Sequence, residues 1–284
     1  MLRKFSFPLL FLALLFLVSC AGEEVEIDPA ESDSHYRLGI EFAQYSLFQN
    51  AIEEFDLAIK YDPNNFKAYD KKGLVYFGLK EYDQAEKMFR EVIVRQPGYT
   101  QAYVNLGMAY YMKGNAGQAL KTWEKAIGIS ENDNDGKAYN NMANVYKKGG
   151  TLDKAIEFYK KALSQNPNNS LYLGNLAEVY RLNGNLAQAE ETLERSLKTN
   201  SKGMLTYFNL GMVYKAQKKI DKSIEAFNQS LAVNPSFPEA YYQIAEIRLS
   251  ENKKDAARQA IEKALSQDPD NSKYKALLER IEQS

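Results

Sequence analysis

The stretch TQAYVNLGMAYYMKGNAGQALKTWEKAIGI, residues 100–129, contains the pattern that decides the fold. It holds two amphipathic segments separated by a turn at Gly114, where a left-handed residue would end a first helix. The small residues Gly107 and Ala119 lie twelve positions apart, so two antiparallel helices can approach closely there. Trp123 is large enough to fill the space between neighbouring helices. The stretch therefore predicts one helix–turn–helix unit.

This unit is repeated along the chain, because the same residue types return every 34 residues, with one interval of 36. The first column of small residues contains Gly39, Gly73, Gly107, Ala143, Ala177, Gly211 and Ala245. The second, twelve positions later, contains Ala51, Ala85, Ala119, Ala155, Ala189, Ser223 and Ala257. A bulky column contains Phe55, Phe89, Trp123, Tyr159, Leu193, Phe227 and Ile261. Columns that keep their register through seven copies predict one continuous array, which leaves no stretch for a separate catalytic domain.

The expected repeats cover residues 32–65, 66–99, 100–135, 136–169, 170–203, 204–237 and 238–271. Residues 272–284 continue the helical periodicity and are predicted to form a capping helix with a polar outer face. Glycines 114, 150 and 184 are predicted to end first helices in the left-handed conformation. Aspartates predicted to cap the second helices are Asp83, Asp153, Asp221 and Asp255. Prolines that follow the second helices are predicted to stop them.

On these columns the chain resembles the tetratricopeptide-repeat (TPR) family over residues 32–271. The resemblance implies an all-α, right-handed superhelical TPR solenoid of seven helix–turn–helix repeats plus the C-terminal capping helix. It also implies that the first helices line a concave groove. In that groove the fifth, sixth and ninth positions of each first helix would face a ligand.

Position six of the repeats predicts a row of amides in this groove, formed by Asn105, Asn141, Asn175, Asn209 and Gln243. A carboxamide both donates and accepts, so such a row can follow the backbone of an extended peptide. A purely architectural role between repeats is left open for these amides. Other residues predicted to complete the peptide-binding groove are Asn144, Tyr111, Met108, Lys148 and Arg181. Apolar residues in the third repeat and cations in the fourth to sixth suggest a peptide with apolar anchors at one end and acidic residues at the other.

The N-terminal residues carry a targeting pattern. Arg3 and Lys4 precede an apolar run that is shorter than the roughly 20 residues that a bilayer-spanning helix needs. The run ends in Leu17-Val18-Ser19-Cys20, which resembles the processing motif of bacterial lipoproteins at all four positions. The resemblance implies a signal peptide over residues 1–19, lipid attachment to Cys20 and an acidic tether over residues 20–31. An ordinary signal peptide and a retained membrane helix are the alternatives.

Composition argues against catalysis, metal binding and nucleic-acid binding. Lys+Arg number 36 and Asp+Glu 37, so the chain lacks the basic excess that phosphate neutralisation requires. One Cys and one His offer little material for a zinc site or a Cys–His pair. His35 takes the place of tyrosines in other repeats and is predicted to pack. Residues 131–136 resemble the start of a calcium loop but lack its closing ligand, because Met142 stands there. We therefore predict no enzyme, no cofactor, no metal site and no nucleic-acid partner.

These features together predict a membrane-anchored TPR scaffold that binds partner proteins or extended peptides in its groove. The expected location is the bacterial cell envelope, outside the cytoplasm, and Ala21 favours the outer membrane if the envelope is Gram-negative. The resemblance extends in type to TPR lipoproteins that assist outer-membrane protein insertion, pilus secretin assembly or peptidoglycan hydrolase regulation. The residues do not choose among these machines. A glycan or other small ligand in the groove is the alternative function, and formation of a homodimer is left open.

Overall fold

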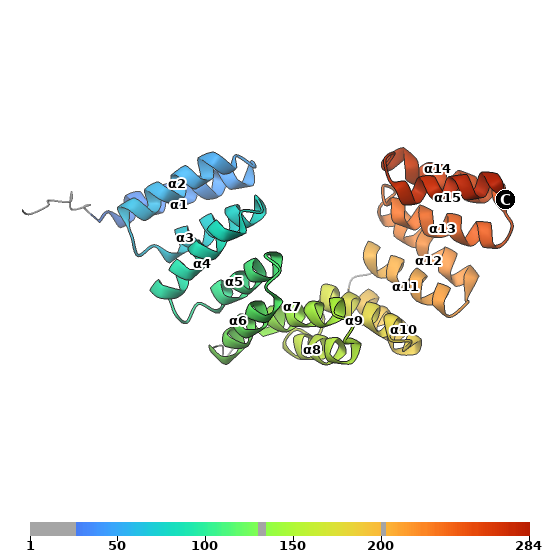
Figure 1. Cartoon of the computed structure of the whole chain (residues 1–284), viewed down its shortest axis with the longest axis horizontal. Helices are drawn as coiled ribbons and strands as arrows, with labels where there is room; N and C mark the ends of the chain where they lie inside the picture. Colours follow the sequence, from blue (N-terminus) through green and yellow to red (C-terminus); the bar gives the residue numbers. More distant parts are fainter. Residues whose placement is uncertain (1–26, 130–134, 200–202) are drawn as a thin grey trace, which may run out of the picture. The chain divides into compact units, whose positions relative to one another are not determined.

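The computed structural model describes residues 27–129, 135–199 and 203–284, and the fold of these residues is all-α. Within them the chain forms fifteen helices, in which the first and second helices of successive repeats alternate (Figure 1). Cys20, most of the predicted tether and residues 131–134 of the acidic turn lie outside the described residues. By its packing the described part of the chain divides into two compact units, with the division between Ala68 and Tyr69.

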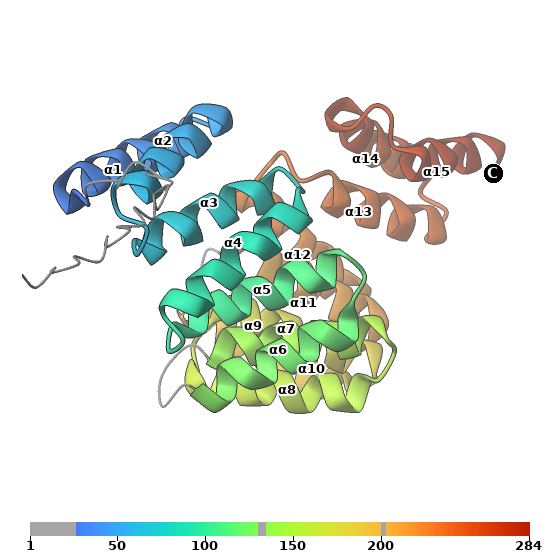
Figure 2. The same ribbon diagram turned by 60° about the vertical axis from the view of Figure 1, so that its left-hand side comes forward.

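The first helices of the repeats are α1 (Pro29–Gln44), α3 (Phe66–Gly78), α5 (Thr100–Met112), α7 (Asp135–Lys148), α9 (Ser170–Leu182), α11 (Met204–Ala216) and α13 (Pro238–Ser250). The second helices are α2 (Phe48–Tyr61), α4 (Tyr82–Arg95), α6 (Ala116–Ile129), α8 (Leu152–Gln165), α10 (Leu186–Thr199), α12 (Ile220–Val233) and α14 (Lys254–Gln267). The chain ends with α15 (Ser272–Gln283). Figure 2 shows α14 and α15 beside α13, and the contacts among these three helices agree.

In the first unit, α1 starts earlier than the sequence predicted. The Asp28 side chain accepts hydrogen bonds from the N–H groups of Ala30 and Glu31, and Pro29 occupies the first helical position, where its missing N–H costs nothing. Residues 29–31, which were predicted to belong to the tether, are therefore helical. His35 packs as expected, because its ring stacks on Tyr61 at 5.4 Å. Its Nδ1 lies 2.6 Å from Glu54 Oε2.

Within each repeat, the small and bulky columns form the contact between the two helices. All residues of the bulky column and of the second small column are fully buried. A Cβ added at Gly39, Gly73, Gly107 or Gly211 would lie only 2.3–2.7 Å from the ring of the bulky residue sixteen positions later. In the other three repeats, alanine opposes Tyr159, Leu193 or Ile261. At the four glycines the Phe or Trp ring occupies the space that a methyl group would need, whereas the Tyr159 ring is packed beside Ala143.

The turns within repeats share one conformation and correct the predicted helix caps. Glycines 114, 150 and 184 have φ of +85°, +74° and +79°, which confirms the predicted left-handed positions. The residue after each left-handed one bonds back to the first helix, as Asn115 N–H does to Tyr110 O, and it also precedes the second helix. The predicted caps Asp83, Asp153, Asp221 and Asp255 consequently fall at the second helical position. There they face the positive end of the helix dipole without capping it.

The ends of the array match the sequence pattern. Helices α2, α4, α8, α12 and α14 each end two residues before a proline, as predicted. The last helix buries Tyr274, Leu277 and Ile281 against the array. Met142, which stands where a calcium loop would need its last ligand, is buried in the core. The described fold therefore agrees with an array closed by a C-terminal capping helix.

Candidate functional site

The predicted site residues lie on one face of the first helices, which we call the first-helix face. On α9 this face contains Leu171, Gly174, Asn175, Glu178 and Arg181, at positions two, five, six, nine and twelve of the repeat. Their spacing of three or four residues places them on the same side of a helix. The equivalent positions recur in each repeat of the second unit. Two kinds of contact connect this face from one repeat to the next, and the structure forms them at some junctions only.

The first kind is an amide contact, from position six of one repeat to position five of the preceding repeat. Between α3 and α5, Asn105 Nδ2 donates to Asp70 Oδ1 at 3.1 Å, and Asn105 Oδ1 accepts from Gln101 Nε2 at 2.8 Å. Asp70 is only 3% exposed. Burial raises the pKa of its carboxyl group, although Lys71 and the Asn105 hydrogen bond act in the opposite direction.

Between α7 and α9 the same contact is made by two neutral side chains. Asn175 Nδ2 donates to Asn140 Oδ1 at 2.9 Å, and Asn140 is 6% exposed. This junction also forms the second kind of contact, a charge contact from position twelve to position nine of the following repeat. There the Lys147 ammonium lies 2.7 Å from Glu178 Oε2. The α7–α9 junction is therefore closed by both contacts.

Between α11 and α13 a single cation makes the connection. Lys215 Nζ donates to Gln243 Oε1 at 2.7 Å and to Glu246 Oε2 at 2.9 Å. Tyr242 donates to the other oxygen of Glu246 at 2.7 Å. Burial raises the pKa of Glu246, but the hydrogen bonds from Tyr242 and Lys215 outweigh it and leave that pKa lowered. Burial and the bond to Glu246 raise the pKa of Tyr242 to about 12.

Asn141 and Asn209 lack the amide contact, because position five of the preceding repeat has no acceptor. That position is Val104 before Asn141 and Gly174 before Asn209. A Cβ added at Gly174 would lie 3.7 Å from Asn209 Nδ2, and no other atom comes as near. Both asparagines are half-buried, and within the described residues neither side chain has another hydrogen bond. Of the predicted row, these two amides are available to a ligand.

The other predicted residues divide between packing and exposure. Asn144 Oδ1 accepts a 2.6 Å hydrogen bond from Tyr159, a core residue whose pKa is raised by burial. Met108 and Tyr111 pack at the edge of the core beside Trp123. Lys148 is exposed, with its ammonium 5.5 Å from the centre of the Tyr111 ring. The structure thus brings Tyr111 and Lys148 together, whereas Asn144 supports the core.

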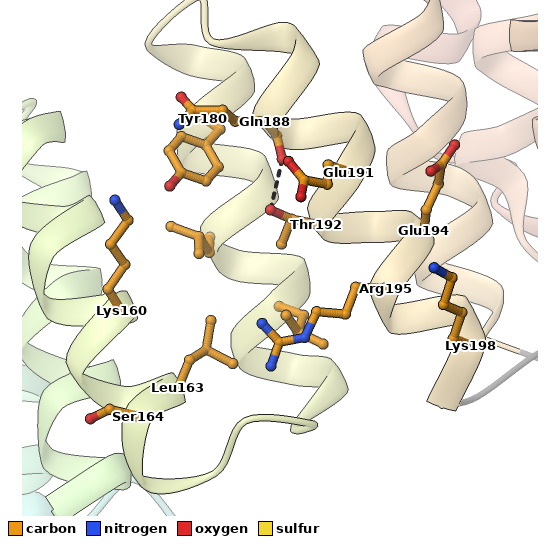
Figure 3. A pocket seen from close by; sticks show the side chains of 12 residues that line it. Lys160, Leu163, Ser164, Tyr180, Gln188, Glu191, Thr192, Glu194, Arg195 and Lys198 are labelled. Carbon is orange, nitrogen blue, oxygen red and sulfur yellow. Dashed lines mark hydrogen bonds between the residues drawn. The ribbon is translucent and has the colours of Figure 1, made fainter.

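A cavity that sequence reasoning missed lies on the opposite side of α9. It measures 550 Å³ and opens between α8 and α10, above Leu173, Leu176 and Tyr180 of α9. Figure 3 shows Lys160 on α8 and Arg195 on α10 at opposite sides of it. The sequence carries no signal for this cavity. Its floor residues occupy the same repeat positions as core residues in other repeats, and the cavity arises from the separation of α8 and α10. Charges of both signs line it, with Glu191 four residues before Arg195 on the same helix, so it shows no preference for an ion of one sign.

Among the residues that the structure describes, no three His, Cys, Asp or Glu side chains gather in a way suited to a metal ion. None of the described helices combines the length and hydropathy needed to cross a bilayer.

Comparison with known proteins identifies similar repeats over most of the chain. Models of the tetratricopeptide repeat match residues 70–134, 136–169, 168–236 and 214–281. The small glutamine-rich tetratricopeptide repeat-containing protein 2 of Saccharomyces cerevisiae is 32% identical over 121 residues, which are 40% of this chain and 35% of that protein. The type IV pilus assembly protein PilF of Pseudomonas aeruginosa is 29% identical over 110 residues, which are 38% of this chain and 44% of PilF.

Among solved structures, a tetratricopeptide repeat protein from Parabacteroides merdae covers 89% of this chain with a TM-score of 0.67 and 15% identity. The alignment covers 99% of that structure. At this identity the match shows a common fold. The chain itself spans less than half the length of either curated relative above, 35% and 44%.

Proposed function

We propose, from the premise that the chain belongs to the tetratricopeptide-repeat family, that it is a lipid-anchored scaffold of the bacterial envelope that binds an extended segment of a partner protein on its first-helix face. Proteins built from this repeat bind protein partners. Binding, and not catalysis, is the role that the described residues support.

The observation that carries this proposal is the pair of available amides, Asn141 and Asn209, on a face that also exposes apolar side chains. Each half-buried carboxamide can donate to a peptide C=O and accept from a peptide N–H. On the same face Leu171 is 61% exposed and Leu205 57%, so apolar side chains of a partner can be buried beside the amides. An extended peptide supplies both kinds of group.

The membrane part of the proposal rests on the sequence. Leu17-Val18-Ser19-Cys20 supports cleavage before Cys20 and attachment of lipid to its thiol, with the repeats held outside the cytoplasm. Two or more acyl chains anchor a protein far more firmly than one. The similarity to a protein named for pilus assembly is compatible with an envelope role. The leading candidates for the partner are therefore envelope proteins.

The groove proposal is tested by crosslinking and affinity capture from native membranes, followed by mass spectrometry. Wild type is compared with the double variant Asn141→Ala, Asn209→Ala. The control is Asn228→Ala, which removes an exposed asparagine from the second helix α12. Circular dichroism first establishes equal helicity. Envelope proteins captured by wild type and control but lost from the double variant support the proposal, whereas three identical capture sets contradict it.

The anchor is tested separately by metabolic labelling with an alkyne-bearing palmitate. The single cysteine of the chain is replaced in Cys20→Ala, and Ser6→Ala in the same N-terminal segment serves as the control. We expect wild type and control to carry the label and to sediment with membranes. Cys20→Ala should lose both properties. A Cys20→Ala chain that keeps its label would show that lipid is attached elsewhere.

A further inference from the structure

Helix α9 makes opposite kinds of junction with its two neighbouring first helices. Toward α7 both the amide and the charge contact are formed. Toward α11 neither can form, because Gly174 has no side chain to accept from Asn209 and Met212 stands where an acid would meet Arg181. Within the described residues, Arg181 makes no ion pair. The α9–α11 junction therefore combines an available amide with an available guanidinium.

The neighbouring junctions show why Arg181 differs from the other cations on this face. Lys147 is neutralised by Glu178, and Lys215 by Glu246, each across the next junction. Arg181 occupies the same position in its own repeat, but Met212 stands at position nine of the following repeat in place of a carboxylate. A guanidinium has two parallel N–H donors that match a carboxylate, so the partner that fits this position is an anion of that shape.

The other end of the junction is apolar. Leu171 and Leu205 hold position two in adjacent repeats and are the most exposed leucines of α9 and α11. The helices α9 and α11 are in direct contact, and both leucines lie at the exposed position two of the first-helix face. Gly174 leaves space between the leucines and the arginine, since an added Cβ there would approach only Asn209.

The spacing defines the length of peptide that would span the junction. Leu171 and Arg181 are ten residues apart on one helix, which corresponds to about 15 Å at 1.5 Å per residue. An extended chain advances about 3.3 Å per residue, so its apolar and acidic side chains would be about five residues apart.

We propose that the α9–α11 junction binds an extended acidic segment of the partner protein, with an Asp or Glu carboxylate on Arg181, the peptide backbone on Asn209 and an aliphatic side chain on Leu171 and Leu205. This inference rests on the proposed binding function and adds to it the chemistry of the partner and the register of binding.

The test uses the full chain purified in detergent and fluorescein-labelled peptides read by anisotropy. The probe is a Ser/Gly peptide of about twelve residues with one Leu and one Glu about five positions apart. Two control peptides replace Glu by Gln or by Lys. We expect wild type to bind the Glu peptide at least about tenfold more tightly than the Gln peptide, as the loss of a charged hydrogen-bond pair predicts.

Two variants of the protein change the α9–α11 junction. One reverses the charge at position 181, and the other gives Arg181 a carboxylate partner within the protein. In Arg181→Glu the preference should reverse, so that the Lys peptide binds more tightly than the Glu peptide. Arg181 also faces the negative end of its own helix, but a merely structural role there would not reverse the preference for ligand charge. Met212→Glu should weaken the Glu peptide by supplying Arg181 with an internal partner. Arg195→Gln, on the second helix of the same repeat, should leave binding unchanged.

The peptide-binding test and the capture test can give different results, and this separates the inference from the proposed function on which it rests. If wild type binds the Glu and Gln peptides equally or not at all, or if Arg181→Glu keeps the wild-type preference, the inference is overturned. Capture of envelope proteins that still depends on Asn141 and Asn209 would then leave the proposed function standing. If that capture is also independent of both amides, the proposed function fails as well.

Discussion

The α7–α9 and α9–α11 junctions are built from the same helix and the same repeat positions, yet their first-helix faces differ. At the first, Asn140 and Asn175 hydrogen-bond and Lys147 pairs with Glu178. At the second, glycine and methionine stand at the equivalent places and leave Asn209 and Arg181 available. The difference shows that an asparagine at position six is hydrogen-bonded to the preceding repeat only where position five of that repeat supplies an acceptor.

The largest expected effect is a difference in unfolding free energy between two variants, each of which removes the position-six amide of one junction. Asn175→Ala should cost about 1–3 kcal/mol of unfolding free energy, because it leaves the buried Asn140 oxygen without its donor. Asn209→Ala should change stability by less than about 0.5 kcal/mol, because it removes no hydrogen bond among the described residues. Chemical denaturation of the two variants measures both. Equal losses would contradict the distinction between closed and available amides.

A smaller effect is expected from closing the second junction. Gly174→Asn supplies at the α9–α11 junction the kind of acceptor that Asn140 provides at the α7–α9 junction. The space around Gly174 accommodates an added side chain, because only Asn209 comes within 4 Å of an added Cβ. Gaining one hydrogen bond and removing a glycine from a helix should stabilise the chain by about 1 kcal/mol. The same variant should bind the acidic peptide less tightly than wild type. Gly128→Asn, also at an open helical glycine but on the second helix α6, is the control for helix propensity.

The charge contact should contribute less than the amide contact. A double-mutant cycle with Lys147→Ala and Glu178→Ala should give a coupling energy of about 0.5 kcal/mol, since both side chains are partly exposed to solvent and screened. Raising the salt concentration should reduce that coupling. A coupling that persists unchanged in high salt would indicate a contact less exposed than the structure shows.

The smallest effect is expected from Asp70→Asn, which converts the Asp70–Asn105 pair into a neutral pair like Asn140–Asn175. Because burial raises the folded-state pKa of Asp70, its ionised form lowers stability above that pKa. The variant should therefore be more stable than wild type near pH 7. The difference should vanish below the ordinary pKa of 3.8, where both states of wild type are protonated. It is small because Lys71 and Asn105 offset part of the burial.

Denaturation curves of wild type and Asp70→Asn at several pH values provide the measurement. Only the difference between the two chains is compared, since other groups titrate in both. A wild type that is the more stable chain at pH 7 would show that the ionised carboxylate strengthens the Asn105 contact by more than its burial costs.

Much of the fold could be predicted because it depends on residues that are close in sequence or repeat at a fixed interval. Gly107 and Trp123 meet within one repeat, so their sizes record the helix contact directly. Gly114 is left-handed for a local reason, as predicted. The predicted N-caps were wrong because the turn within each repeat sets where the second helix begins. It places Asp83 and its equivalents at the second helical position instead of at the cap.

The amino-acid sequence by itself determined the period, the seven repeats, the pairing of small with bulky residues and the column in which the amides lie. Only the tertiary structure decided which of those amides are used within the protein and that a cavity opens between α8 and α10. The physical reason is that a hydrogen bond between repeats depends on two side chains 35 residues apart. Their atoms come within 2.9–3.1 Å only once the helices have packed.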